Sequence, residues 1–442
     1  MADTTFQSGK QIKLTGGQTI TVTRWLGGGG QGDVYEVDVG GRSMALKWYK
    51  RSSFKDSEKF QKFRKNIEKN INAGAPSDVF LWPEALTEEI NGTFGYIMKL
   101  RPKGYEDFPK FLKAKVRFKD GQVAIRASLK MVNAFKQLHN KGLSYQDIND
   151  GNFFINPDTG DVLVCDNDNV AEYGASFGIA GKPGYVAPEI VLSEKTPSVH
   201  TDRFSLAVML FLALVMSRPF EGQMTRVPCL TEAHDEKFFG KDPVFIFHPT
   251  DERNRPVRGL DNNALNLWPT LPQYMHDAFQ KTFVDGVKDK GSSEDQRRTT
   301  ETEWEKLLLR LRDETILCPT CSWETVYPTD GTEAKCLNVK CAQSLSPLLL
   351  LEMKGAKIVI YPTMKVYGNH MGKVDDFDKG YGEVVTNKKN PNLWGIKNQS
   401  ELAWQEHTPD GNTKTVENGN AVRALAGITI SFGNGITAEI TR

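Results

Sequence analysis

A glycine-rich segment near the N-terminus can bring backbone amides close to phosphate groups. Within residues 26–35 it spaces Gly27, Gly29 and Gly32 ahead of Val34. Because glycine lacks a Cβ atom, the N–H groups of such a loop can approach phosphate oxygens. The same pattern also fits a flexible turn. The runs on both sides are strand-like, which argues against the dinucleotide-binding fingerprint, where a helix follows the loop.

A lysine follows this loop at the end of an expected strand. Lys47 comes fifteen residues after the last of these glycines, in a strand-like run over residues 44–49. A second strand at that separation can run back beneath the phosphates, where a fixed ammonium neutralises their charge if a carboxylate holds it. Our candidate for that carboxylate is Glu68, on a helix expected over residues 59–72. Glu58 is the alternative, because the helix register is open.

The segment over residues 143–155 provides an Asp-x4-Asn spacing. Asp147 and Asn152 precede an expected hairpin, and Asp166 follows it, nineteen residues after Asp147. An aspartate that orients a hydroxyl nucleophile needs a nearby asparagine and a second aspartate to hold Mg²⁺ on the phosphates. The ordered set of glycine loop, lysine, Asp-x4-Asn and aspartate predicts phosphoryl transfer from MgATP. Asn152 and Asp166 are the expected metal ligands.

Four of the six cysteines lie in one short window. They are Cys318, Cys321, Cys336 and Cys341. Four thiolates on two short knuckles predict a closed tetrahedral Zn²⁺ site with a structural role. The residues between the two knuckles, 325–335, fit a hairpin that turns at Asp330-Gly331.

Length and composition predict a multidomain protein whose main activity does not depend on its net charge. The chain has 442 residues, more than one ordinary core contains, and 39% of them are hydrophobic. Its 56 basic and 55 acidic residues nearly cancel, which excludes bulk attraction to nucleic acid or membrane as the main activity. The longest central apolar run, residues 205–216, is too short to span a bilayer. The first ten residues lack secretion features, so we expect a cytoplasmic, reducing location.

Hydrophobic periodicity places the motifs on expected elements. Residues 1–98 are strand-rich with one helix, residues 100–313 are mostly helical, and short strands at close spacing begin at about residue 350. The helices expected in the middle part cover residues 123–141, 201–216, 271–284 and 302–311. The fold class is therefore α+β with several domains.

On these motifs the chain resembles the eukaryotic-like protein kinases over residues 20–313. The segment 181–189 (GKPGYVAPE) matches the end of an activation segment, and Asp202 matches the start of the central helix. Arg298 is similar to the arginine that pairs with the Ala-Pro-Glu carboxylate, here Glu189. The resemblance implies a two-lobed serine/threonine protein kinase that uses ATP and Mg²⁺ on a protein substrate, with lobes over 1–98 and 99–313.

The resemblance also implies roles for further residues. Asp147 orients the nucleophile, and Lys47 fixed by Glu68 holds the phosphates. The nucleotide is expected to contact the glycine loop and five further residues, namely Val34, Ala45, Met98, Lys99 and Leu100.

Some positions depart from the family pattern. Gln146 replaces an arginine that reads an activation-loop phosphate, and the segment to Glu189 offers only Tyr173, Ser176 and Tyr185 as hydroxyl side chains. We therefore do not expect ordering by phosphorylation.

Two further departures move charge within the site. Asn149 replaces a lysine beside the γ-phosphate, while Lys182 replaces a threonine. Our hypothesis is that Lys182 reaches Asp147 and the transferring phosphoryl group. The alternative is that Lys182 extends into solvent from an exposed loop. Asp168 replaces a glycine and is expected to be solvated, with an added metal contact as the alternative. These changes leave open an alternative, a pseudokinase-type nucleotide-binding scaffold that recruits partners through its C-terminal domain.

The C-terminal third resembles two small domains. Residues 314–346 are expected to form a zinc ribbon, and residues 347–442 a β-sandwich similar to forkhead-associated domains. The arginine and serine that read phosphothreonine in that family are not evident, and His370 is expected at the surface. The domain order also resembles bacterial signalling kinases of tellurite-resistance type. That resemblance implies a von Willebrand A-domain protein and a phosphatase as partners, with no membrane or nucleic acid.

Overall fold

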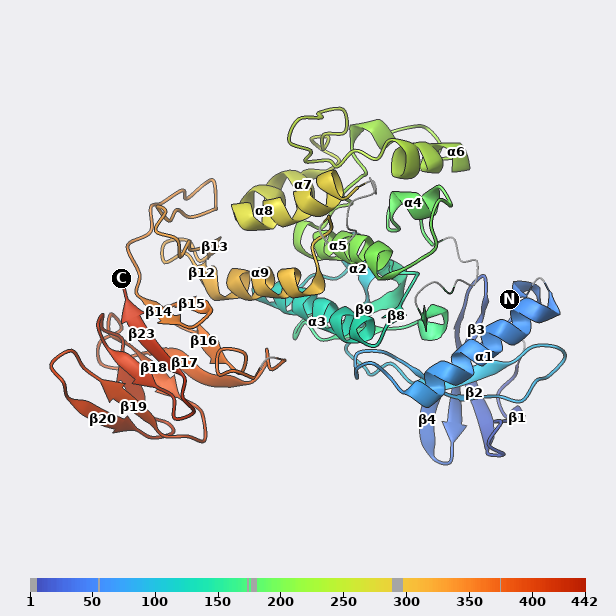
Figure 1. The fold of residues 1–442 in the computed structure, drawn as a ribbon, viewed down its shortest axis with the longest axis horizontal. Coiled ribbons are helices and arrows are strands. Elements are labelled where there is room, and N and C mark those ends of the chain that lie inside the picture. The colour runs from blue at the N-terminus through green and yellow to red at the C-terminus, as the bar shows by residue number, and fades with distance from the viewer. Residues whose placement is uncertain (1–5, 55, 173–174, 176–180, 288–296, 374) are drawn as a thin grey trace. The chain divides into compact units, whose positions relative to one another are not determined.

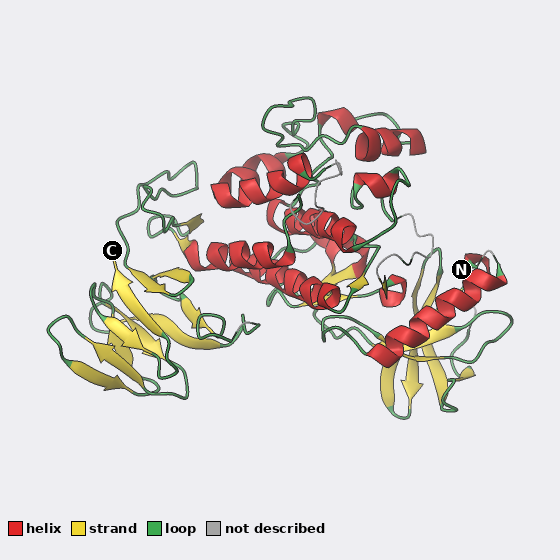
Figure 2. Ribbon diagram, viewed as in Figure 1, coloured by secondary structure: helices red, strands yellow, loops and turns green. Residues whose placement is uncertain are grey.

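The computed structural model describes residues 6–54, 56–172, 175, 181–287, 297–373 and 375–442 (Figure 1). The chain divides into two compact units, one made of Met1–Trp268 with His276–Glu305 and the other of Pro269–Met275 with Lys306–Arg442. Helices and strands are mixed in the first unit, whereas strands dominate the second (Figure 2). The expected α+β, multidomain class is confirmed.

An antiparallel sheet forms the N-terminal part of the first unit. Its strands are β1 (Gln11–Lys13), β2 (Thr19–Gly28), β3 (Gly32–Val39), β4 (Arg42–Tyr49), β5 (Pro83–Leu86) and β6 (Gly95–Lys99), in the order β1-β2-β3-β4-β6-β5. Side chains alternate across β4, as the pleat of a strand requires. Met44, Leu46 and Trp48 enter one hydrophobic cluster, whereas Ala45 and Tyr49 enter the cluster on the other face. By the same alternation Lys47 shares the face of Ala45 and Tyr49.

Helix α1 (Ser57–Ala73) packs on that second face (Figure 1). Asp56 caps its start by accepting a 2.7 Å hydrogen bond from the Lys59 N–H. Phe60, Phe63 and Ile67 recur at helical spacing and join the cluster that contains Tyr49. The helix expected over residues 59–72 is therefore confirmed, with its apolar stripe against the strand that carries Lys47.

The remainder of the first unit is mostly helical. The helices are α2 (Phe108–Leu112), α3 (Gly121–Asn140), α4 (Pro188–Val191), α5 (Val199–Val215), α6 (Glu232–Glu236), α7 (Asn262–Leu267), α8 (Gln273–Gln280) and α9 (Glu301–Glu314), of which α8 and α9 include residues of both units. Short strands accompany them, namely β7 (Glu106–Asp107), β8 (Leu143–Ser144), β9 (Phe153–Ile155), β10 (Val162–Val164) and β11 (Ala171–Glu172). The expected hairpin is confirmed, because β9 pairs antiparallel with β10. The part of the chain described contains no helix that is both long and apolar enough to cross a membrane.

Helix α5 is buried along most of its length and carries Asp202 in its first turn. His139 of α3 lies between two carboxylates, 3.2 Å from Asp202 and 2.9 Å from Glu301 of α9. Arg203 adds an ion pair to Glu301 at 3.0 Å. Burial alone would lower the pKa of His139, but the hydrogen bonds that its ring donates to Asp202 and Glu301 outweigh burial and raise that pKa to about 9.

The second unit contains two larger antiparallel sheets, beside a short two-stranded one. One has the order β15-β14-β23-β22-β19-β20 and the other β16-β17-β18-β21. The strands are β14 (Leu350–Met353), β15 (Ala356–Val359), β16 (Lys365–Tyr367), β17 (Gly380–Thr386), β18 (Trp394–Asn398), β19 (Trp404–His407), β20 (Thr413–Val416), β21 (Ala421–Arg423), β22 (Thr429–Ser431) and β23 (Thr437–Thr441). Buried side chains of both sheets, such as Ile440 and Ile396, share one core, so the sheets pack face to face.

Two details of this unit correct the expectations. Strand β13 (Glu324–Val326) pairs with β12 (Thr315–Leu317), which precedes the first cysteine, and not across Asp330-Gly331. The two paired strands therefore flank the first knuckle, with Cys318 and Cys321 in the connection between them. His370, expected at the surface, is only 7% exposed. It lies 2.8 Å from Asp313 and 3.2 Å from Arg312, so this histidine serves a buried polar network.

The His139 network predicts that stability depends on pH. A histidine whose pKa rises from 6.5 in the unfolded chain to about 9 stabilises the fold fully below pH 6.5, and this contribution is lost as the pH rises through 9. We expect a loss on the order of 3 kcal/mol in the free energy of unfolding between pH 6 and pH 10.

Urea unfolding followed by tryptophan fluorescence checks this, with His139→Gln as the comparison. The difference in stability between wild type and His139→Gln should shrink as the pH rises. A difference that is the same at pH 6 and pH 10 would contradict the assignment.

Candidate active site

The glycine loop joins β2 to β3 as a tight turn. Gly28 pairs with Asp33 in the ladder, and the Gly29 N–H donates to the Gly32 carbonyl at 2.8 Å. A Cβ atom on Gly32 would lie 2.3 Å from the Trp48 carbonyl oxygen, whereas Gly27, Gly29 and Gly30 have open space where a Cβ would be. Close packing of strands therefore requires the last glycine. The open space leaves the loop tip accessible to a ligand.

Apolar side chains gather beneath this loop. Ala45 and Met98 are opposite each other in the β4–β6 ladder and share a cluster with Leu163 of β10, against which Val34 and Leu100 also pack. An apolar cluster of this kind suits a nucleobase. Four of the five further residues expected to contact the nucleotide thus come together.

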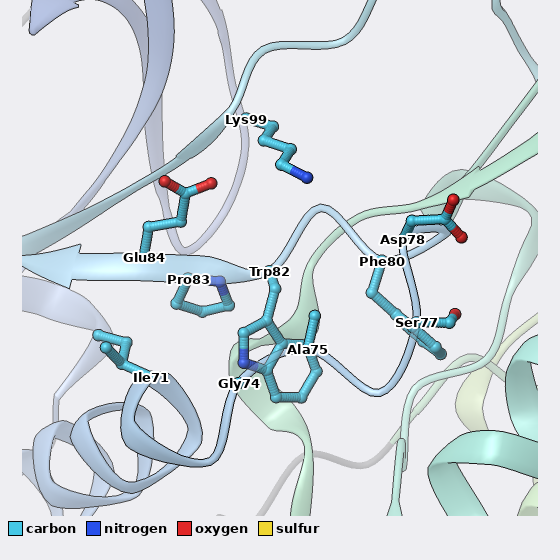
Figure 3. Close-up of a pocket in the computed structure, with 10 residues that line it drawn as sticks. All are labelled: Ile71, Gly74, Ala75, Ser77, Asp78, Phe80, Trp82, Pro83, Glu84 and Lys99. Atoms are coloured by element: carbon cyan, nitrogen blue, oxygen red, sulfur yellow. The ribbon is translucent and has the colours of Figure 1, made fainter.

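The fifth residue, Lys99, has its side chain elsewhere. It lines a separate cavity of about 560 Å³, together with Gly74 and Asp78 from the segment after α1 and Trp82 and Glu84 from β5 and its approach (Figure 3). Figure 3 draws the Lys99 ammonium above this hollow, facing the side of Asp78. This corrects the expectation for the Lys99 side chain.

Lys47 lies in a buried charge cluster. Its side chain is 5% exposed, and its Nζ is 2.7 Å from Asp168 Oδ2 and 3.0 Å from Asp166 Oδ1. The Tyr49 hydroxyl donates to the same Asp168 oxygen. Burial by itself lowers the pKa of Lys47, but Asp168 and Asp166 outweigh it and raise that pKa above its ordinary value.

The carboxylate partner of Lys47 differs from the expected one. Among the described residues, Lys47 pairs with Asp166 and Asp168, whereas Glu68 is exposed and Glu58 pairs with Lys62 at 2.7 Å. Glu68 follows the buried Ile67, and one residue turns a helix by about 100°. The turn carries Glu68 off the inner face of α1. Asp168 itself was expected to be solvated, and it is fully buried.

Asp147 lies in a loop held by amide side chains. The Asn149 Nδ2 donates to Asp147 Oδ1 at 3.0 Å, and the Asn152 Nδ2 donates to the Asp147 carbonyl at 2.9 Å. Burial raises the pKa of Asp147 to about 6, and the nearby Asp166 adds to the rise. The amide of Asn149, which replaces the family's lysine, thus orients this carboxylate.

The backbone of this loop is bound to the central helix. The N–H groups of Tyr145 and Gln146 donate to the Asp202 carboxylate at 2.5 and 3.1 Å. The Gln146 side chain donates to the Ala175 carbonyl at 2.7 Å, and Gln146 has a φ of 73°. A carboxylate that receives two buried N–H groups fixes the chain direction just before Asp147.

Asn152 and Asp166 offer oxygens suited to a divalent cation. The Asn152 nitrogen is used within the loop, which leaves its amide oxygen as an acceptor, and the Asp166 side chain is 41% exposed. Asp166 has a φ of 56° at the start of the turn Asn167–Asn169, in the left-handed region. Hard oxygen donors of this kind fit Mg²⁺. The donor chemistry therefore fits the expected metal.

Lys182 contacts a neighbour of the expected partner. Its Nζ lies 2.7 Å from Asp150 Oδ1, and Arg218 lies 3.6 Å from the other oxygen of the same carboxylate. This corrects the expectation that Lys182 reaches Asp147. Asp150 is buried, so it attracts the cation that the sequence placed three residues earlier.

The end of the segment after Asp166 is fixed by an ion pair. Arg298 donates to both oxygens of Glu189, at 2.8 and 3.0 Å, and both side chains are buried. The expected pair is confirmed. Tyr185 is also buried, whereas Tyr173 and Ser176 lie outside the described residues.

The four cysteine sulfurs form a compact cluster. All four Sγ atoms lie within 4.8 Å of one another, with Cys318 to Cys341 at 4.0 Å and Cys321 to Cys336 at 3.6 Å. A tetrahedral zinc with Zn–S bonds of ~2.3 Å has sulfurs ~3.8 Å apart. The donor set and its size therefore fit Zn²⁺.

Sequence reasoning missed Tyr49 and Asp150 and placed the Asp168 side chain in solvent. Tyr49 lies two residues after Lys47, so strand alternation alone could have placed it on the same face. Asp168 and Asp150 carried no such signal, because their burial depends on elements distant in the chain.

The comparisons with known proteins agree with this geometry. The family described as protein kinase domain matches residues 20–271, more than half of the chain, so the chain belongs to the protein kinase family. A cGMP-dependent protein kinase of Drosophila melanogaster (isozyme 2 forms cD5/T2) is 27% identical over 219 residues, 48% of this chain and 22% of that protein. The "Probable serine/threonine-protein kinase CCRP1" of Zea mays is 30% identical over 98 residues, 21% of this chain and 16% of that protein. The chain thus spans at most about a fifth of either relative.

The glycine loop yields a prediction about stability. Gly32→Ala should destabilise the N-terminal sheet by about 1–3 kcal/mol, because its Cβ would press on the Trp48 carbonyl. Gly30→Ala, at a position with open space, is the matched control and should leave the sheet as stable as in the wild type.

Hydrogen exchange of the β3 and β4 amides measures both variants. Equal protection in Gly32→Ala and Gly30→Ala would show that the close approach between the strands is not real.

Proposed function

We propose that this chain is an active serine/threonine protein kinase, which transfers the γ-phosphoryl group of MgATP to a hydroxyl of a partner protein. The observation that carries the proposal is the convergence of Lys47, Asp166 and the loop with Asp147 and Asn152. Lys47 lies 3.0 Å from Asp166, Asn152 donates to Asp147, and Asp166 is near enough to Asp147 to raise its pKa. Phosphoryl transfer needs little covalent chemistry from the protein, so positioning and charge do most of the catalysis.

Each of these residues has a distinct role in the proposal. Lys47 places positive charge on the phosphates, and Asp147 orients the substrate hydroxyl and accepts its proton. Asn152 and Asp166 would hold Mg²⁺, which neutralises charge on the phosphate oxygens when bound. The glycine loop with Val34, Ala45, Met98 and Leu100 would bind the nucleotide.

A protein substrate is favoured over a small molecule. The segment ending in Glu189 is tied to Arg298 by a buried ion pair, and Asp202 fixes the loop that precedes Asp147. These elements build the platform on which the family binds polypeptides. The alternative is a scaffold that binds nucleotide without turnover, and the assay below separates the two.

We further propose that residues 314–346 are a zinc ribbon and residues 347–442 a forkhead-associated-like sandwich, beside lobes over 1–98 and 99–313. The sulfur cluster and the two facing sheets support these assignments. Arg312 contacts Asn369 and His370 at 3.2 Å each, so these two polar side chains are used within the protein. The sandwich is therefore proposed as a partner-binding domain. The domain order supports a von Willebrand A-domain protein and a phosphatase as those partners.

The kinase proposal predicts a loss of turnover in one variant. Asp147→Asn should lower the rate of phosphate transfer from labelled ATP by at least about 100-fold, because the hydroxyl loses its orienting base. Asp158→Asn, in the exposed β9–β10 turn, is the matched control and should keep the wild-type rate. Nucleotide binding by a wild type that transfers no phosphate to itself or to generic protein substrates would favour the scaffold.

The zinc proposal predicts about one Zn²⁺ per purified chain. Cys318→Ser should remove that zinc and destabilise residues 314–346, because three thiolates leave the tetrahedron open. Cys229→Ser is the matched control, since Cys229 is exposed and far along the chain from the cluster. Elemental analysis measures both variants, and a wild type with four reduced cysteines and no zinc would contradict the proposal.

A further inference from the structure

Lys47 is a buried cation and depends on the charges around it. It is 4% exposed, and an ammonium in such a place is costly unless carboxylates compensate its charge. Two carboxylates do so, at 2.7 Å from Asp168 and 3.0 Å from Asp166. The pair is asymmetric. The Asp168 side chain is fully buried, whereas the Asp166 side chain is 41% exposed.

This asymmetry separates two tasks. An exposed carboxylate can exchange partners and take up a hydrated cation, which Asp166 must do to bind Mg²⁺. A carboxylate without access to water cannot take up a hydrated cation. Asp168 therefore contacts only groups inside the protein. Those groups are the Lys47 ammonium and the Tyr49 hydroxyl, which both donate to Asp168 Oδ2.

Helix α1 contributes amides to this region and no carboxylate. Asn66 and Asn70 each donate to the Val170 carbonyl at 2.8 Å, while Glu68 is exposed. The contact of α1 with β4 is apolar, since the Phe63 ring lies 5.3 Å from the Tyr49 ring. The helix thus supports Tyr49 by packing and leaves the charge on Lys47 to the turn that follows Asp166.

That turn is itself held rigidly. Asn167 donates from Nδ2 to the carbonyls of Leu81 and Val164, at 2.8 and 3.0 Å, and is fully buried. Asp166 and Asp168 therefore flank a residue that is fixed to the end of β10 just before it and to the distant Leu81. The metal-binding oxygen and the lysine anchor share one short stretch of backbone.

We propose that Asp168 is the positioning residue for Lys47, in the role that the sequence assigned to a glutamate of α1. The inference rests on the proposed kinase function and deepens it. With Asp168 holding the ammonium, Asp166 is free to bind the metal, and the remaining N–H of Lys47 is directed to a phosphate oxygen. Tyr49 supports Asp168 by its hydroxyl, and α1 acts only through packing.

Nucleotide binding by calorimetry tests this without turnover. The probes are a non-hydrolysable ATP analogue with Mg²⁺ and adenosine, which has no phosphates. Asp168→Asn should weaken binding of the analogue about tenfold or more and leave adenosine affinity within about twofold of wild type. The reason is that Lys47 then pairs with Asp166 alone, which withdraws both groups from the phosphates and the metal. More Mg²⁺ should also be needed to saturate analogue binding.

Three further variants complete the test. Tyr49→Phe should act in the same direction with a smaller effect. Glu68→Gln should bind both probes as the wild type does, and Glu172→Gln, an exposed carboxylate four residues after Asp168, is the matched control.

Several outcomes would overturn the inference. One is that Asp168→Asn binds the ATP analogue with wild-type affinity. Another is that this variant loses affinity equally for adenosine and for the analogue, which would mark a merely structural residue. The third is a tenfold loss of analogue affinity in Glu68→Gln. Failure of the wild type to bind either probe would instead reject the proposed function itself.

Discussion

The rest of the site depends on the hydrogen bonds that the buried Asp202 carboxylate accepts from the backbone. This carboxylate lies in the first turn of α5, where negative charge is favoured, and it accepts the N–H groups of Tyr145 and Gln146. Without it, two buried donors would be unpaired and the loop that carries Asp147 would lose its direction. His139 bridges the same carboxylate to Glu301, so α3, α5 and the start of α9 meet at one charge network.

Beyond Asp202, the charged side chains of the site are held in place by pairs of opposite charge. Among the described residues of the site, Lys47 pairs with Asp166 and Asp168, and Lys182 pairs with Asp150. Because a buried unpaired charge costs several kcal/mol (roughly 3–5 when one partner is removed), these pairs constrain the arrangement more than any single contact does. The family's lysine–glutamate pair is thereby replaced without leaving the ammonium unpaired.

The sequence allowed the elements to be predicted well and their partners less well. The strand over residues 44–49 that carries Lys47 and the helix over residues 59–72 were predicted, because the periods of strands and helices are local properties of the sequence. Motif spacing likewise identified the glycine loop and the cysteine cluster. The burial of Asp168, the Lys182–Asp150 pair and the β12–β13 ladder were missed, since each depends on which distant segment arrives at that place.

The contact between Gln146 and the Ala175 carbonyl joins two neutral groups. The family's arginine at that position would instead bind a phosphate group on the activation segment. A hydrogen bond without net charge is little affected by ionic strength, since screening acts on charges, and it gains nothing from a phosphorylated side chain. The hydrogen bond between Gln146 and Ala175 therefore forms without phosphorylation. Its strength depends on the distance and angle between the Gln146 amide and the Ala175 carbonyl, and therefore on the local geometry and not on charge.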